Sequence, residues 1–178
     1  MRNYQDVRMR LAALCEGETD DIAIMATVSQ ELFASFDGFD WVGFYRVVQP
    51  DLLKIGPYQG GHGCLVIPFD KGVCGAAART GKVQLVDDVE AFDGHIACSA
   101  STRSELVMPV FDLQGSVRVV LDIDSDQLAF FTREDVRHLS DILDNSFAHA
   151  WQDSALICPA PLSRIRQITQ KMRLLPIS

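Results

Sequence analysis

The sequence lacks any long hydrophobic run. Its uninterrupted apolar stretches are a few residues long, far short of the roughly 20 that cross a bilayer as a helix. The opening residues, MRNYQDVRMR, also lack the apolar core of a secretory signal. We therefore expect a cytoplasmic protein with no membrane partner.

Positive charge is also scarce. The chain has 16 Lys and Arg against 24 Asp and Glu, a net charge of −8. Proteins that bind nucleic acid depend on basic surfaces, so we expect no nucleic-acid partner. With 48% hydrophobic and 22% charged residues, the 178-residue chain has the composition of one soluble globular domain, and it contains no internal repeat.

A disulfide framework is not expected, because the five cysteines are an odd number in a chain without a secretory signal. Cys15 and Cys158, near the ends, are interpreted as small buried hydrophobes. Cys64, Cys74 and Cys98 instead lie among glycines and polar residues. Such flanks favour loops that bend sharply or approach a ligand closely.

Hydrophobic periodicity predicts four helices and a run of short strands. Helices are expected at 2–15, 20–36, 72–79 and 132–151, the last begun by a capping box of Thr132 with Asp135. In the second helix the spacing predicts an apolar stripe of Ile22, Met25, Val28, Leu32 and Phe36. In the last, the inner face is expected to hold Leu139, Ile142, Leu143 and Phe147.

Strands are expected at 41–48, 52–55, 65–68, 84–86, 105–111 and 117–123. Gly56-Pro57 is expected to break the second of them, and 87–104 reads as a polar connection. Helices at both ends around antiparallel strands indicate an α+β fold, with one sheet covered by helices.

The C-terminal part differs in charge from the rest. Pro159-Ala160-Pro161 marks a boundary, and we divide the chain into a domain at 1–154 and a tail at 155–178. The tail has four basic and no acidic residues, so the domain carries −12. The apolar residues of the tail recur at helical spacing. This spacing predicts that the tail packs on its own domain or on a dimer mate rather than on a membrane.

Three acids and two aromatic residues form a candidate site. Strand alternation places Asp122 and Asp124 on one face, and Glu105 begins the preceding strand. Acids are rare in strands and raise each other's pKa when buried. Trp41 and Tyr45 also share a strand face, which forms an apolar wall with two polar groups.

Three kinds of site combine cysteines with acids and an aromatic wall. A thiolate can attack a sulfoxide while an acid protonates its oxygen, after which a second thiol resolves the sulfenic acid as a disulfide. A zinc site would draw on Cys64, Cys74, Cys98, His62 and His95, but their spacing matches no zinc motif, and we expect no metal. The third possibility is a small-molecule sensor with incidental cysteines.

Several motifs resemble the free methionine-(R)-sulfoxide reductases, which are single GAF-domain enzymes. The similarity extends over about residues 15–151. The most specific strings are Phe92-Asp93-Gly94-His95-Ile96-Ala97-Cys98 and Leu121-Asp122-Ile123-Asp124-Ser125, accompanied by Trp41-Val42-Gly43-Phe44-Tyr45, Gly56-Pro57-Tyr58-Gln59-Gly60, Ile67-Pro68, Gly72-Val73-Cys74-Gly75 and Ser104-Glu105.

The resemblance implies a GAF fold, with the terminal helices on one face of an antiparallel sheet and the ligand pocket on the other. It implies an oxidoreductase of the oxidative-stress response without a bound cofactor, which takes electrons from thioredoxin and is often a homodimer. Cys98 matches the nucleophile, Cys64 its disulfide partner and Cys74 a third redox-active cysteine, with either order of attack open. The matching substrate-binding residues are Trp41, Tyr45, Glu105, Asp122 and Asp124. The alternative is a GAF ligand-binding or redox-sensing module without turnover.

Overall fold

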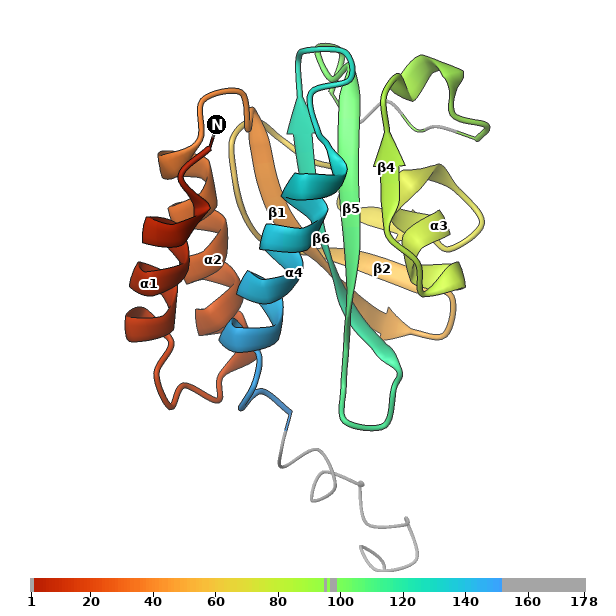
Figure 1. The fold of residues 1–178 in the computed structure, drawn as a ribbon. Coiled ribbons are helices and arrows are strands. Elements are labelled where there is room, and N and C mark those ends of the chain that lie inside the picture. Colours follow the sequence, from red (N-terminus) through yellow and green to blue (C-terminus); the bar gives the residue numbers. More distant parts are fainter. Residues whose placement is uncertain (1, 95, 97–98, 152–178) are drawn as a thin grey trace, which may run out of the picture.

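One antiparallel sheet runs through the middle of the protein (Figure 1). The computed structural model describes residues 2–94, 96 and 99–151. The six strands lie side by side in the order β3-β2-β1-β6-β5-β4, and each pair of neighbours is antiparallel. Their bounds are β1 Trp41–Gln49, β2 Leu52–Gln59, β3 Val66–Pro68, β4 Gln84–Val86, β5 Ser104–Phe111 and β6 Val117–Ser125.

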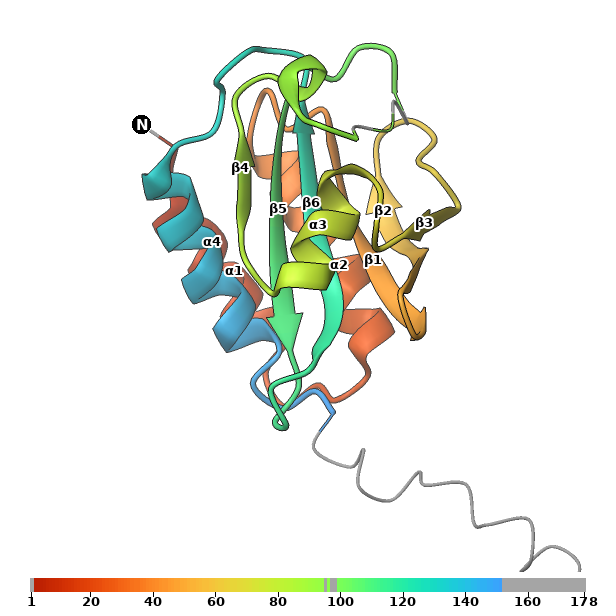
Figure 2. The same cartoon turned by 90° about the vertical axis from the view of Figure 1, so that its right-hand side faces the viewer.

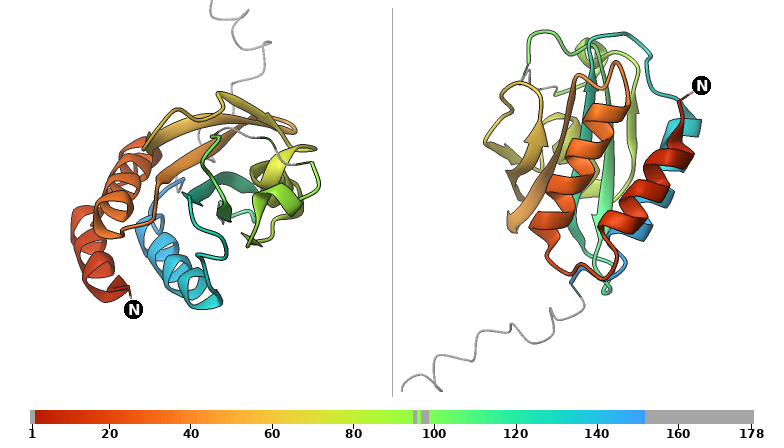
Figure 3. Two further views of the ribbon diagram at one scale, coloured as in Figure 1. Left: turned by 90° about the horizontal axis from the view of Figure 1, so that it is seen from above. Right: turned by 90° about the vertical axis from the view of Figure 1, so that its left-hand side faces the viewer.

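The helices lie on both faces of this sheet. The helices α1 (Tyr4–Leu14), α2 (Asp21–Ser35) and α4 (Arg133–Ser146) cover one face, and α3 (Gly72–Thr80) covers the other (Figure 2). The view from above shows α1, α2 and α4, the terminal helices, on one side of the sheet and α3 on the other (Figure 3). The expected α+β architecture with terminal helices on one face is confirmed. None of the helices in the described residues is long and apolar enough to cross a membrane.

Each face of the sheet has its own core. Phe44, Leu121 and Ile123 belong to the core under the terminal helices, while Tyr45 and Val120 belong to the core under α3. Neighbouring residues of one strand therefore enter opposite cores, as the two-residue period of a strand requires. This alternation directs Asp122 away from the terminal helices and toward the α3 face.

The capping box at the start of α4 is confirmed. The Thr132 side chain accepts from the Asp135 backbone, while the Asp135 carboxylate accepts from the Thr132 backbone N–H at 2.8 Å. The expected end of the helix at residue 151 is wrong, because α4 ends at Ser146. From there Ala148 N bonds Asn145 O and Ala150 N bonds Phe147 O, three residues back, which closes tight turns instead of α-helix.

Two further local expectations are wrong. Ile22 is 42% exposed and Ile24 is buried instead, because at about 100° per residue Ile22 lies at the margin of the face that Met25, Val28 and Leu32 bury. β2 also continues through Pro57 to Gln59. Pro57 is tolerated because it lies beyond the part of β2 that pairs with β3 and beside a register shift in the pairing with β1.

Candidate functional site

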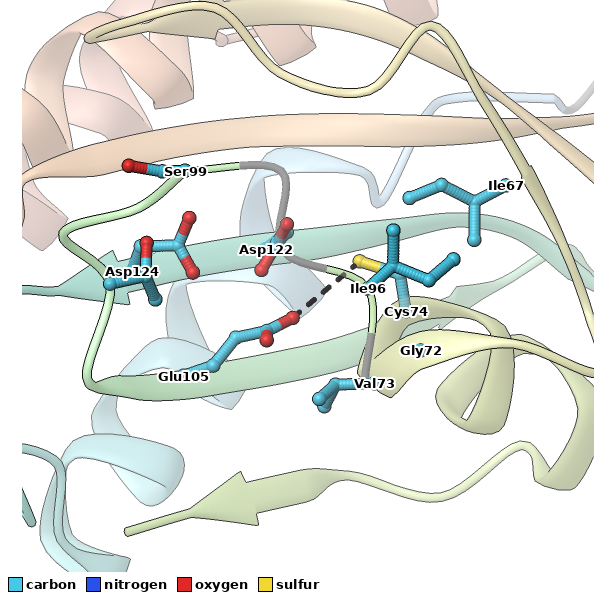
Figure 4. Close-up of a pocket in the computed structure, with 10 residues that line it drawn as sticks. Ile67, Gly72, Val73, Cys74, Ile96, Ser99, Glu105, Asp122 and Asp124 are labelled. Atoms are coloured by element: carbon cyan, nitrogen blue, oxygen red, sulfur yellow. Dashed lines mark hydrogen bonds between the residues drawn. The ribbon is translucent and has the colours of Figure 1, made fainter. Parts of the chain in front are cut away.

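A pocket opens on the α3 face of the sheet. Its empty space is about 380 Å³, including the open mouth. The lining comes from β3, α3, the connection before β5, and the strands β5 and β6 (Figure 4): Ile67, Gly72, Val73, Cys74, Ile96, Ser99, Thr102, Glu105, Asp122 and Asp124. Four of the residues expected at the site therefore meet here: Cys74, Glu105, Asp122 and Asp124.

The three acids converge because of the register between β5 and β6. Glu105 pairs directly with Asp124, and Asp122 is two residues further along the same face. Glu105 and Asp122 are 7% and 6% exposed, so both carboxyl groups are buried. The side chains of Glu105 and Asp122 point toward each other and toward Cys74 (Figure 4). The Cys74 Sγ donates to Glu105 Oε1 at 3.9 Å.

Burial changes the protonation of these acids. Loss of water raises the pKa of Glu105 well above its usual value, and the charges of Asp122 and Asp124 add to the effect. Burial and the charge of Asp122 likewise raise the pKa of Asp124 well above its usual value, although a hydrogen bond from Thr102 opposes the shift. Burial raises the pKa of Asp122 to about 6, and the nearby donors Cys74 and Glu105 limit this increase. Burial thus favours the protonated form of all three acids, and the donors Cys74 and Glu105 oppose this effect at Asp122.

One oxygen of this cluster lacks a partner. Asp122 Oδ1 is buried and accepts no hydrogen bond among the described residues. Buried polar atoms in folded proteins are nearly always paired, since an unpaired one loses water without compensation. Because Asp122 lines the pocket, this oxygen is available to a donor on a bound ligand.

Cys74 lies in α3, which confirms the helix expected at 72–79, although its glycine neighbours favoured a loop; it is 3% exposed. The glycines serve close packing instead: a Cβ added at Gly75 would lie 2.5 Å from Pro68 O. Burial, followed by the charges of Asp122 and Glu105, raises the pKa of the Cys74 thiol well above its usual value. Cys74 therefore stays a thiol at neutral pH, which is the poorly nucleophilic form.

The other cysteines have different surroundings. Cys64 lies in the loop between β2 and β3, is partly exposed and is disulfide-bonded. Cys15 is a free cysteine in the core under the terminal helices, as expected. Cys98 and Cys158, like His95, lie outside the described residues.

The aromatic wall supports the loop that carries Cys64. Trp41 and Tyr45 stack with ring centroids 5.9 Å apart, and both are buried beside the pocket rather than among its lining residues. Trp41 Nε1 donates to Gly61 O at 3.1 Å. A Cβ added at Gly63 would lie 2.9 Å from Tyr45 Oη, so glycine allows the loop to press against the wall. The wall thereby fixes the position of the backbone next to Cys64.

Some lining residues were not found by sequence reasoning. Ile96, Ser99 and Thr102 come from the connection between β4 and β5, which has no hydrophobic period. The connection is drawn over the pocket by tertiary hydrogen bonds, such as Gly72 N to Gly94 O at 2.9 Å. No local pattern in the sequence predicts such a contact.

Metal-ligating atoms meet at the same cluster. Cys74 Sγ and carboxylate oxygens of Glu105 and Asp122 lie within 4.8 Å of one another, and among the described residues no other group of three gathers in this way. His62 and Cys64, from the zinc set weighed above, do not join it. Metal binding would require Cys74 and Glu105 to lose protons that burial holds in place, so the cluster favours proton transfer over metal binding.

Replacing Asp122 with Asn should stabilise the protein at neutral pH. An acid whose pKa is higher in the folded protein stabilises it below the unfolded value, 3.8, and loses that contribution as pH rises through about 6. At 1.36 kcal/mol per pKa unit, the shift costs at most about 3 kcal/mol at pH 7. Thermal melts should show Asp122→Asn melting higher than wild type at pH 7, with the difference shrinking toward pH 4. Equal melting temperatures at pH 7 would contradict the buried charge.

The fold and the matched sequence define the class of this protein. Residues 19–145 match the model of the GAF domain family, and the chain is a GAF domain protein. A solved structure of free methionine-R-sulfoxide reductase from Neisseria meningitidis, in complex with its substrate, superposes with a TM-score of 0.75 and 38% identity, covering 82% of this chain and 89% of that one.

Two curated relatives carry the same name. The free methionine-R-sulfoxide reductase of Escherichia coli is 40% identical over 140 residues, which are 79% of this chain and 84% of the relative. That of Saccharomyces cerevisiae is 36% identical over 117 residues, or 62% and 65% of the two chains. The chain belongs to the free methionine-R-sulfoxide reductase family, and the resemblance inferred from its motifs is confirmed.

Proposed function

We propose that this protein reduces free methionine-(R)-sulfoxide to methionine with electrons from thioredoxin. The observation that carries the proposal is the buried acid cluster, in which one Asp122 oxygen has no partner among the described residues, in a chain 40% identical to a named reductase of this substrate. The solved relative from Neisseria meningitidis, in complex with its substrate, supports the same assignment.

The acids suit the polar groups of the substrate. Free methionine sulfoxide has an ammonium group, a carboxylate and a polar S=O bond. The ionised Asp122, with its free Oδ1, is the acceptor that an ammonium requires. Glu105 and Asp124, whose pKa values burial raises, are proposed as the donors to the sulfoxide oxygen. Trp41 and Tyr45 are proposed to support the apolar side of the substrate.

The cysteines are proposed to carry out the reduction in two steps. The Cys98 thiolate attacks the sulfoxide sulfur while Glu105 protonates the oxygen, and methionine leaves as Cys98 becomes a sulfenic acid. The Cys64 thiol then attacks the sulfenic sulfur, which releases water and forms a Cys64–Cys98 disulfide. Cys64 is disulfide-bonded, which supports its role as one partner of the bridge. Cys74, buried as a thiol, is assigned a supporting redox role.

The regeneration step needs a dithiol. Thioredoxin supplies two electrons and two protons by thiol–disulfide exchange, so no bound cofactor or metal is part of the proposal. We further infer a homodimeric, cytoplasmic enzyme in the response to oxidative stress, from its resemblance to the family. Sedimentation of the purified protein tests the dimer.

Removal of residues 159–178 should leave the chemistry intact. The proposed site residues lie between positions 41 and 124, and the tail differs in charge from the domain at 1–154. We expect kcat and KM of the truncated protein within about twofold of wild type, with any change confined to the oligomeric state. A folded truncated protein without activity would show that the tail contributes to the site.

The proposed function is tested with separate epimers and substrates. Purified protein is supplied with thioredoxin, thioredoxin reductase and NADPH, and methionine is quantified. Turnover is expected with the R epimer of the free amino acid, but with neither the S epimer nor a peptide-bound sulfoxide. Binding of the R epimer without methionine formation would favour the sensor alternative instead.

A further inference from the structure

Two exposed apolar side chains follow Cys64 in the chain. Leu65 follows the cysteine directly and is 72% exposed, and Val66 is 45% exposed. Apolar side chains left in water beside a reactive group are typical of a surface that a partner covers. The buried Ile67 that follows belongs to the core under α3 and is one of the pocket-lining residues.

The backbone at this place is open as well. β3 is at the edge of the sheet, and among the described residues it pairs only with β2. Leu65 O accepts from Ile55 N at 3.1 Å, and Phe69 N donates to Asp51 O at 3.0 Å, so alternate residues of this segment bond to β2. The alternation turns the N–H and C=O of Val66 to the open side, where another chain can pair with them.

The loop is held in place rather than merely exposed. Its glycines press against Trp41 and Tyr45, through the Trp41 bond to Gly61 and the close approach of Gly63. The segment around Leu65 is therefore held in place, because the Leu65 backbone is hydrogen-bonded to β2 while its side chain is exposed. A supported surface binds a partner at a lower entropic cost than a mobile one.

We propose that Leu65, Val66 and the open edge of β3 form the docking surface for the protein dithiol that regenerates the enzyme, and that this dithiol attacks the sulfur of Cys64. The proposal rests on the proposed function. A reductant must bring a thiolate into contact with one sulfur of the disulfide, so the surface around the partly exposed Cys64 is where it binds. The partner is a small protein that presents apolar side chains and free backbone groups around two thiols.

The exchange is balanced. One thiolate of the partner attacks Cys64 Sγ, which forms a mixed disulfide and expels the Cys98 thiolate. The second thiol of the partner then attacks its own sulfur in that mixed disulfide and releases the Cys64 thiolate. The partner is oxidised by two electrons, and its two protons restore the two enzyme thiols.

Leu65→Asp, compared with Leu113→Asp, tests the docking surface. Leu113 is 70% exposed, which matches Leu65, but it lies in the turn between β5 and β6 at the far end of the sheet (Figure 2). We expect Leu65→Asp to lower kcat/KM for thioredoxin at least tenfold, with dithiothreitol-driven turnover within twofold of wild type. Leu113→Asp should change neither rate.

The same experiment identifies other outcomes. An unchanged rate with thioredoxin in Leu65→Asp overturns the docking surface, and a change of oligomeric state with that rate unchanged assigns the surface to a second copy of this chain. A wild-type protein that makes no methionine with dithiothreitol overturns the proposed function itself, and the docking surface with it.

A trapping experiment tests the choice of sulfur. Thioredoxin that retains only its attacking cysteine is mixed with the oxidised enzyme, and the mixed disulfide is mapped by peptide analysis. We expect the link at Cys64. A link at Cys98 would overturn the attack on Cys64.

Discussion

Cys98→Ser is expected to abolish methionine formation with thioredoxin and with dithiothreitol alike. A serine hydroxyl is a poor nucleophile toward sulfur and cannot hold the transferred oxygen as a sulfenic acid. The buried, protonated Cys74 is unsuited to replace it, because its thiolate would form beside Asp122 and Glu105. Methionine is quantified under both reductants to check this result.

Cys64→Ser should give a different pattern. The first step survives, so Cys98 still becomes a sulfenic acid that excess dithiothreitol can reduce directly. Thioredoxin exchanges with a disulfide, so its turnover should fall far more than the dithiothreitol-driven turnover. Cys15→Ser, at a free cysteine of the opposite core, is the matched control and should be near neutral, as should Cys158→Ser. Equal losses under both reductants in Cys64→Ser would refute its role as resolving residue.

Glu105→Gln should lower turnover by about 10²- to 10⁴-fold while the protein remains folded. Positioned acid catalysis is worth this much, and an amide cannot deliver the proton that the sulfoxide oxygen requires. Asp122→Asn should also lower turnover, since it removes the carboxylate proposed for the ammonium. Steady-state kinetics with the R epimer measure both effects, and circular dichroism verifies the fold.

Glu90→Gln provides the control for this pair. Glu90 is an exposed acid in the short helix Val89–Ala91, outside the pocket lining. Its replacement makes the same chemical change without touching the cluster, so its rate should equal that of wild type. Near-wild-type rates in both Glu105→Gln and Asp122→Asn would show that neither acid is needed for turnover.

The sequence predicted the parts of the site that follow a regular period. The two-residue period of strands placed Asp122 and Asp124 on one face and Leu121 and Ile123 on the other, and the structure confirms both. The site depends on this alternation, since a shift by one residue would turn the acids into the core under the terminal helices.

Features set by tertiary contacts could not be predicted in this way. The helix at 72–79 was predicted, but the role of Gly75, which allows α3 to pack closely against the backbone before it, was not. Ile22 is exposed because the buried face of its helix is centred on Met25, Val28 and Leu32, which the packing of the helix on the sheet decides. Thr102 reaches the pocket because the connection before β5 is tied over it, and such ties join residues far apart in the sequence.

A single turnover without reductant tests the central claim most directly. Reduced protein is mixed with an excess of free methionine-(R)-sulfoxide, and methionine, free thiols and disulfide-linked peptides are measured together. We expect one methionine formed and two thiols lost per chain, through a bridge of Cys64 to Cys98. A bridge of Cys74 to Cys98 would contradict the choice of resolving residue. Methionine formed by Cys98→Ser but not by Cys74→Ser would contradict the choice of nucleophile, and no methionine from the wild type would contradict the proposed function.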